Sequence, residues 1–318
     1  AALVLCALSA AAGAQELWER DCANIQRRID ALPRSGGAVT LGTGAWVCHA
    51  PIVIGDNVSL RGAGLTTRIT LDADANCPVI VIGSTASVPE AVVRGASVAS
   101  LSIDGNRTAQ DFECFHGACS AGNALRNNGI TVRRASDVRV EDVTVAHAAS
   151  GGLVSELGTV RLLVKNFSAF DNAFDGLAAY ETENSVFTGL SLHDNLAAGI
   201  SLDIRFRNNI VSNAVLDSNA KVGIFMRDST ENVFSGLVVR NAGEHGIFLA
   251  QVDSDSRLPA AANTFTGVSI SKSKGAAIRV NDVSCVNNVL SSAVLSGNAA
   301  CVSEATPGLL KTAAVVCQ

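Results

Sequence analysis

A glycine followed by an aliphatic residue recurs along the chain from residue 129 onward, with spacings of 23, 24, 23, 24 and 23 residues. The pairs are Gly129-Ile130, Gly152-Leu153, Gly176-Leu177, Gly199-Ile200, Gly223-Ile224 and Gly246-Ile247, with a weaker form at Ala277-Ile278. Each unit lacks the apolar stripe of an amphipathic helix and holds short alternating runs, such as residues 138–140 and 237–239, between Asn, Asp, Gly and Ser. Each unit therefore predicts one coil of short β-strands.

Two columns of asparagine indicate that these coils stack on one another. The first column precedes the repeat glycines by four residues and contains Asn172, Asn195 and Asn219. The second precedes an inward hydrophobic residue by two and contains Asn209, Asn232 and Asn263. Stacked asparagines can satisfy one another's amides from coil to coil. The fold class predicted is all-β: a single-stranded right-handed parallel β-helix with coils about 4.8 Å apart.

The N-terminal part predicts a leader and a cap. Residues 1–14, AALVLCALSAAAGA, are apolar and end in small residues, so we interpret them as a signal peptide without its initiating Met and basic start. A lipid anchor at Cys6 is the weaker alternative because bulky Leu5 precedes it. Residues 21–32 predict an amphipathic helix that covers one end of the stack, where strand edges would otherwise be unpaired. We expect one β-helix domain over residues 15–318, secreted or periplasmic, without a membrane span.

The composition narrows the partners. The chain is 48% hydrophobic and 17% charged with a net charge of −5, so it lacks the basic excess of a nucleic-acid binder, and we expect no nucleic-acid partner. Its nine cysteines, eight without Cys6, suit an oxidising compartment. Cys114 and Cys119 are predicted to form a disulfide within one loop. The N-terminal and C-terminal cysteine sets are separated by several coils, so we expect one unpaired cysteine in each set. These sets are Cys22, Cys48 and Cys77, and Cys285, Cys301 and Cys317.

Two stretches carry family resemblances. The order of an amphipathic helix, then GGAVTL (36–41), PIVI (51–54) and NVSLRGAG (57–64), resembles the start of the pectate-lyase-like (pectin lyase-like) β-helix superfamily. Residues 98–106 and 129–251, with AFDNAFDGLAAYETENSVFTGLSLHDN, resemble the β-helix module of mannuronan (alginate) C5-epimerases. That family is secreted and acts on uronic-acid polymers. Its Asp-Pro-His-Glu motif falls on Val154, Ser155, Glu156 and Leu157, so the resemblance implies the scaffold and a carbohydrate groove but none of the catalytic residues.

The repeat register also predicts the faces of the coils. The inward column is Val132, Ser155, Ala179, Leu202, Met226, Leu249 and Val280, which is almost wholly apolar. The next position gives an outward column of Arg133, Glu156, Tyr180, Asp203, Arg227, Ala250 and Asn281. Successive members of this column should lie about 5 Å apart. The column therefore brings carboxylates, a phenol and a cation onto adjacent coils.

The outward column fits the chemistry of uronate lyases and epimerases, which need a cation, a base and an acid around one sugar. We assign Arg227 as the cation that neutralises the sugar carboxylate, Asp203 as the base or sugar-orienting carboxylate, and Tyr180 as the proton donor. Glu156 is a candidate second carboxylate. The candidate substrate-binding residues are Arg133, Arg205, Lys221 and His245. The alternative is an ordinary charge ladder, with Asp203 in surface ion pairs with Arg205 and Arg227.

Three functions remain open. The first is a polysaccharide lyase or C5-epimerase acting on an acidic, uronate-containing polysaccharide or oligosaccharide. The second is an inverting glycoside hydrolase that uses Asp203 with Glu156 or Asp228. The third is a non-catalytic glycan-binding surface protein, since the fold alone does not decide activity. The superfamily allows a divalent cation, but no clustered Asp run requires one, and we expect no cofactor.

Overall fold

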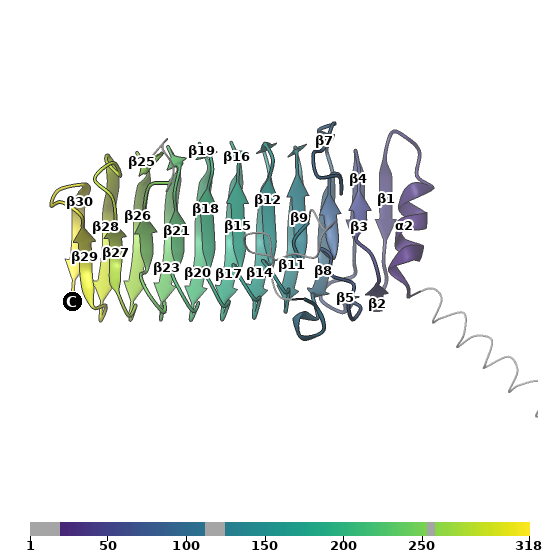
Figure 1. The fold of residues 1–318 in the computed structure, drawn as a ribbon, viewed down its shortest axis with the longest axis horizontal. Coiled ribbons are helices and arrows are strands. Elements are labelled where there is room, and N and C mark those ends of the chain that lie inside the picture. The colour runs from purple at the N-terminus through teal and green to yellow at the C-terminus, as the bar shows by residue number, and fades with distance from the viewer. Residues whose placement is uncertain (1–19, 112–124, 253–257) are drawn as a thin grey trace, which may run out of the picture.

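The computed structural model describes residues 20–111, 125–252 and 258–318, over which the chain forms one elongated stack of parallel coils (Figure 1). The helix α2 (Cys22–Asp30) lies at one end of the stack, and the strands β29 (Ala300–Glu304) and β30 (Leu310–Cys317) lie at the other. The predicted parallel β-helix with a capping helix is confirmed. The predicted signal peptide and the predicted Cys114–Cys119 disulfide lie outside the described residues.

Three parallel sheets, which we call A, B and C, run along the stack and have 13, 10 and 7 strands in the described part of the chain. Sheet A contains β1 (Gly37–Thr40), β2 (Gly44–Cys48), β4 (Val58–Arg61), β5 (Thr67–Leu71), β8 (Ser97–Asp104), β11 (Arg139–Ala146), β14 (Leu163–Phe170), β17 (Val186–His193), β20 (Ile210–Asp217), β23 (Val233–Arg240), β26 (Thr264–Ser271), β28 (Asn288–Ser296) and β30. Sheet B contains β3 (Ile52–Ile54), β6 (Ile80–Ile82), β9 (Ile130–Arg133), β12 (Leu153–Glu156), β15 (Leu177–Tyr180), β18 (Ile200–Asp203), β21 (Ile224–Met226), β24 (Ile247–Leu249), β27 (Ala276–Val280) and β29. Sheet C contains the two-residue strands β7 (Val93–Arg94), β10 (Ala135–Ser136), β13 (Thr159–Val160), β16 (Thr182–Glu183), β19 (Phe206–Arg207), β22 (Ser229–Thr230) and β25 (Ala260–Ala261). A single 3-10 turn, η1 (Arg107–Ala109), completes the elements of this part.

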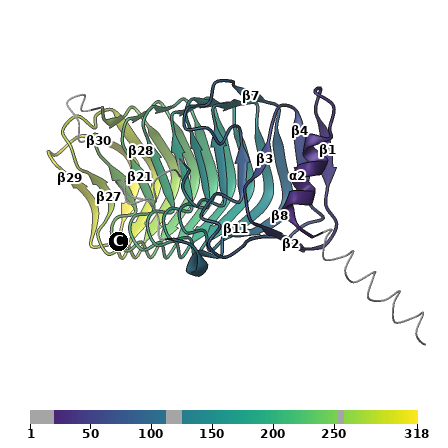
Figure 2. The same ribbon diagram turned by 45° about the vertical axis from the view of Figure 1, so that its right-hand side comes forward.

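The sequence repeat corresponds to one coil. In sheet B, Leu153 pairs with Leu177 and Leu177 pairs with Ile200, so the aliphatic residue after each repeat glycine stacks on its counterpart. Figure 2 shows the same coils obliquely, with the strands of successive coils side by side along the whole stack. The sequence therefore predicted the register of sheet B correctly.

The long strands of sheet A each bend once. The bend lies at a residue with positive φ, such as Asn166 (50°), Gly189 (66°) or Asn213 (53°). Asn and Gly adopt this left-handed conformation at the lowest cost among common residues. The bend lets one strand change direction without leaving the sheet.

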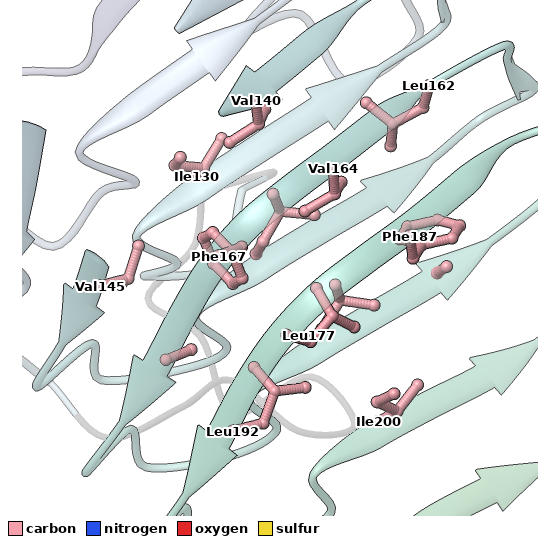
Figure 3. Packing of buried hydrophobic residues seen from close by; sticks show 14 of the residues in the cluster. Ile130, Val140, Val145, Leu162, Val164, Phe167, Leu177, Phe187, Leu192 and Ile200 are labelled. Atoms are coloured by element: carbon pink, nitrogen blue, oxygen red, sulfur yellow. The ribbon is translucent and has the colours of Figure 1, made fainter. Parts of the chain in front are cut away.

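The interior is filled by columns of apolar side chains. The predicted inward column is confirmed, because Val132, Ala179 and Leu202 are 0% exposed and its other members are buried with them. Figure 3 shows how Phe167 and Phe187 pack with aliphatic residues from neighbouring coils. Alternation along each strand therefore leaves the neighbouring positions of sheet B free to face outward.

Both asparagine columns form buried hydrogen-bonded ladders. In the first, Asn172 Nδ2 donates to Asn195 Oδ1 over 2.9 Å, and Asn195 Nδ2 donates to Asn219 Oδ1 over 2.9 Å. The backbone N–H of each donor residue also binds the same oxygen, as in Asn172 to Asn195 at 3.3 Å. The second column is built in the same way and extends one coil beyond the predicted residues, to Asn288. The ladders hold the turns of adjacent coils in register.

The helix α2 closes the N-terminal end of the stack. Asp21 caps it by accepting the Ala23 N–H over 2.8 Å, and Ile25 and Ile29 are buried against the first coils. Among the described residues, none of the helices has both the length and the hydrophobicity of a membrane span.

Disulfides lie near both ends of the stack, where Cys22 is joined to Cys48 and Cys301 to Cys317. In the described part of the chain, Cys77 and Cys285 are free and buried. Burial raises the pKa of each of these two thiols to about 11. The prediction of one unpaired cysteine in each set is confirmed.

Replacing Asn195 with Ala is predicted to destabilise the protein by about 2 to 6 kcal/mol. The change leaves the Asn172 N–H and the Ala169 carbonyl without their buried side-chain partner, and each buried group left unsatisfied costs about 1 to 3 kcal/mol. Urea unfolding followed by circular dichroism measures the loss. Asn213→Gly is the matched control, since Asn213 is exposed and glycine occupies the same bend in β17 and β23. Equal, small changes in both variants would show that the ladder contributes little.

Candidate active site

The outward face of sheet B carries a cavity of about 630 Å³. Strands β9, β12, β15, β18, β21 and β24 contribute to its floor, with up to two outward side chains per coil because side chains alternate along each strand. All four predicted catalytic residues, Glu156, Tyr180, Asp203 and Arg227, line this cavity. Of the predicted substrate-binding residues, Lys221 lines it as well. The structure thus brings most of the predicted set together on one surface.

Strand pairing places the central residues next to one another. Tyr180 on β15 pairs in register with Asp203 on β18, one coil apart. Arg227 follows the last residue of β21, and its N–H still donates to the Leu202 carbonyl over 2.9 Å. Adjacent strands in a sheet lie about 4.8 Å apart, so these three side chains begin within two coil steps of one another.

Asp203 and Arg227 form a partly buried ion pair. Arg227 Nη2 and Nε donate to Asp203 Oδ2 over 2.6 Å and 3.0 Å, while Asp203 Oδ1 accepts the Ile204 N–H over 2.8 Å. The Asp203 residue is only 6% exposed. Burial raises the pKa of the Asp203 carboxyl, and the positive charge of Arg227 opposes that rise. Asp203 is therefore a carboxylate held at a fixed angle and more basic than a solvated one.

The alternative of a surface charge ladder is wrong for Arg205. That guanidinium pairs with Glu181 over 2.5 Å, on the turn toward sheet C, and does not contact Asp203. Asp228, the other carboxylate considered for a hydrolase, is buried in the same turn. Its Oδ2 accepts the Arg205 N–H over 2.9 Å, and it does not line the cavity. Arg205 and Asp228 therefore form their charged and hydrogen-bonded contacts within the turn and not in the cavity.

Tyr180 is half-buried and lines the cavity. Burial raises the pKa of its phenol above the ordinary value, and the negative charge of Asp175 adds to this shift, whereas Arg126 and Ser201 oppose it. The phenol therefore stays protonated at neutral pH. A protonated phenol next to a carboxylate can donate a proton, in accordance with the role predicted for it.

Arg133 does not reach the cavity. Its side chain is 3% exposed and donates to Glu156 Oε1 over 2.7 Å and to the Ser84 and Ala86 carbonyls over 2.9 Å and 2.7 Å. The guanidinium thus fixes the 84–87 segment and orients Glu156. The prediction that Arg133 binds substrate is corrected, because its donors are directed at the protein.

His245 lies beside the cavity without lining it. Its Nδ1 accepts the Ala276 N–H over 3.0 Å, and its ring packs near Phe248 with 5.7 Å between centroids. Burial and the charge of Arg279 lower the pKa of the imidazole, so it is neutral at physiological pH. The structure therefore gives His245 the position of a support for Phe248 in place of the predicted direct contact with substrate.

The sequence analysis missed two groups of cavity residues. The first is the pair Phe225 and Phe248, whose rings are parallel within 8° with 5.6 Å between centroids. Both follow a repeat glycine by two residues, so the same alternation that predicted the outward column could have found them. The second is Asp175, which is 2% exposed and accepts the Ala198 N–H on its Oδ1 over 2.9 Å. The sequence feature that could have indicated Asp175 is its position immediately before the repeat glycine Gly176.

Within residues 20–111, 125–252 and 258–318, no group of three or more His, Cys, Asp or Glu side chains is arranged to hold a metal ion. Of the four acidic residues that line the cavity, Glu156, Asp175 and Asp203 are engaged with Arg133, the Ala198 N–H and Arg227, and the fourth, Glu244, is exposed. The described donors therefore suit proton transfer and hydrogen bonding.

Comparison with known proteins identifies the fold. Residues 128–293, more than half of the chain, match the family model described as "Right handed beta helix region". The A-module of the Azotobacter vinelandii mannuronan C-5 epimerase AlgE6 superimposes with a TM-score of 0.58 at 17% identity, covering 92% of this chain and 94% of that one. ORF18 of Geobacillus virus E2 gives 0.72 at 16% identity and covers 92% and 56%. The Aspergillus tubingensis endo-xylogalacturonan hydrolase gives 0.64 at 11% identity and covers 89% and 86%. A search of curated proteins by sequence finds no match.

The Asp203 carboxyl is predicted to titrate above its ordinary pKa of 3.8, and Arg227→Gln is predicted to move it higher still. The reason is that burial disfavours the carboxylate, whereas the guanidinium favours it, so removing the guanidinium leaves the Ile204 N–H as the remaining group that opposes the effect of burial. Carboxyl-carbon NMR titration of the native and variant proteins measures both values. Asp137, whose pKa its exposed partner Arg161 lowers to about 2, is the control and should not change. Titration of Asp203 at or below 3.8 would contradict this description of the site.

Proposed function

We propose that this chain, which belongs to the right-handed β-helix family, is a carbohydrate-active enzyme that acts as a lyase or C5-epimerase on a uronate-containing glycan. The observation that carries the proposal is a protonated, half-buried phenol, Tyr180, in register beside the Asp203–Arg227 pair within one cavity. Structural neighbours that are named as a mannuronan epimerase and a xylogalacturonan hydrolase support a glycan as the partner.

The roles within the cavity follow from how each group is held. Arg227 is committed to Asp203, so its main task is to fix and polarise that carboxylate. Lys221 is exposed and lines the same cavity, which makes it the better cation for the carboxylate of the sugar. We therefore revise the predicted assignment and give the neutralising role to Lys221, with Arg227 as a positioning residue.

The chemistry begins with removal of the proton at the carbon next to the sugar carboxylate. Asp203 accepts this proton, and Lys221 stabilises the negative charge that spreads onto the carboxylate. In a lyase, the electron pair forms a carbon–carbon double bond, the bond to the leaving glycosidic oxygen breaks, and Tyr180 gives its proton to that oxygen. In an epimerase, Tyr180 returns a proton to the same carbon from the opposite face. Both routes use the phenol in its protonated state, which its raised pKa favours.

An inverting hydrolase is the second candidate, supported by one observation. Glu156 and Asp203 both line the cavity on coils that flank Tyr180. Their backbone positions are two coil steps apart, about 10 Å, near the range of about 6.5 to 9.5 Å between the carboxyl groups of inverting enzymes. Asp228 is no longer a candidate because it is buried in the turn.

Action outside the cytoplasm is part of the proposal. The Cys22–Cys48 and Cys301–Cys317 disulfides suit a protein that folds in an oxidising compartment. A secreted or periplasmic enzyme would meet extracellular glycans there.

Tyr180→Phe is predicted to lower the turnover rate on an acidic glycan by about 10² to 10⁴, the usual contribution of a positioned acid. Purified protein is incubated with a panel of uronate-containing and neutral glycans. Ultraviolet absorbance detects the unsaturated product of a lyase, NMR detects inversion at C5, and a reducing-end assay alone detects a hydrolase.

Phe170→Ala is the control for this variant, because it alters another half-buried aromatic residue that lies on sheet A and does not line the cavity. It should keep the native rate. Reducing ends without an unsaturated product would favour the hydrolase. Binding without turnover on every glycan of the panel would leave a non-catalytic glycan-binding protein.

A further inference from the structure

The stacked rings of Phe225 and Phe248 have no role in the interior of the coil. Ile224 and Met226, which flank Phe225, and Ile247 and Leu249, which flank Phe248, fill the core at 0% exposure. Both phenylalanines, in contrast, face outward and are only half-buried. The separation of 5.6 Å between centroids exceeds the contact distance of about 3.5 to 4.0 Å between stacked carbon atoms. The rings are therefore offset, and part of their aromatic surface faces the cavity.

The floor of the cavity changes height at Phe225. Phe225 and Phe248 belong to a second outward column, whose members follow each repeat glycine by two residues. On the two coils before Phe225, this column carries Ala178 and Ser201. Ala178 pairs with Ser201, and Ser201 pairs with Phe225. Small side chains leave space beside Tyr180 and Asp203, and the large rings fill the corresponding space on the next two coils. A ligand that is deepest beside the proposed catalytic residues would therefore rise onto the two rings.

A cation lies in register beyond the rings. Phe248 pairs with Arg279 on β27, one coil further along the column. The guanidinium of Arg279 is half-buried and donates to the Ser303 Oγ over 2.7 Å and to the Asn281 Oδ1 over 3.4 Å. Both partners are neutral, so no carboxylate takes part in these two contacts, and the positive charge of Arg279 lies on the coil next to Phe248, just outside the cavity lining.

The Phe225 and Phe248 rings are also held in place from both sides. Arg227 packs over the Phe225 ring with 5.1 Å between its guanidinium carbon and the ring centroid. His245 packs near Phe248 at the other end, with its Nδ1 fixed by the Ala276 N–H. A flat apolar surface that is already ordered loses little conformational entropy when a ligand covers it.

We infer that Phe225, Phe248 and Arg279 form a second sugar subsite, which binds an acidic sugar of the glycan next to the residue that lies between Tyr180 and Asp203. The apolar face of the pyranose ring packs on the two phenylalanine rings, and its carboxylate binds Arg279. The glycan then runs along the axis of the stack, from the small residues Ala178 and Ser201 toward the C-terminal coils. The inference rests on the proposed function, because it places a neighbouring sugar relative to the same cavity.

Calorimetric binding of a uronate tetrasaccharide and of a neutral tetrasaccharide tests the subsite without requiring turnover. Phe248→Ala is expected to weaken binding of the uronate chain by about tenfold or more, since an aromatic face is lost. Phe248→Leu keeps the side chain apolar and should lose less than Phe248→Ala, which separates ring packing from misfolding. Arg279→Gln is expected to weaken the uronate chain by about tenfold and to leave any binding of the neutral chain unchanged.

Phe170→Ala is the matched control, because Phe170 is also a half-buried ring stacked on another ring, His193, but lies on sheet A. It should bind like the native protein. If the native protein binds the uronate chain and Phe248→Ala binds it equally well, the subsite is wrong and the proposed function stands. An equal loss for both chains in Arg279→Gln would overturn the recognition of the carboxylate. If the native protein binds neither chain, the proposed function itself fails.

Discussion

Successive parallel coils pair in register along this structure. Each residue of a coil lies above one residue of the coil before it, so a feature that occurs once per repeat becomes a continuous column. The buried asparagine ladders prevent the coils from slipping, because each amide is bonded both to the next amide and to a backbone N–H. A slip of one residue would turn the apolar columns outward and the charged column inward. The same register that buries the core therefore also assembles the cavity.

This register explains why the fold and much of the candidate site could be predicted from the sequence. Once Gly176 and Gly199 were aligned, the inward position of Ala179 and the adjacency of Tyr180 and Asp203 followed from alternation alone. The same alternation also predicts that Phe225 and Phe248 face outward, because each follows its repeat glycine by two residues.

The choice of ion-pair partners could not be predicted in this way. Long side chains extend beyond their own coil, and their partners depend on turns whose path is not periodic. Arg133 is directed to carbonyls of the 84–87 segment, and Arg205 to Glu181, although both were expected to face a ligand. Asp203 bonds to Arg227 because the two lie on neighbouring coils of the same face. The corrections to the site thus concern side-chain direction, whereas the backbone positions were right.

The proposed function places a uronate glycan on sheet B with one sugar between Tyr180 and Asp203. A crystal structure of the Tyr180→Phe variant soaked with a uronate tetrasaccharide tests it most directly. We predict one sugar ring above Ala178 and Ser201, with its carboxylate within hydrogen-bonding distance of Lys221. A tetrasaccharide bound on sheet A or sheet C, with the cavity on sheet B holding no sugar, would contradict the claim.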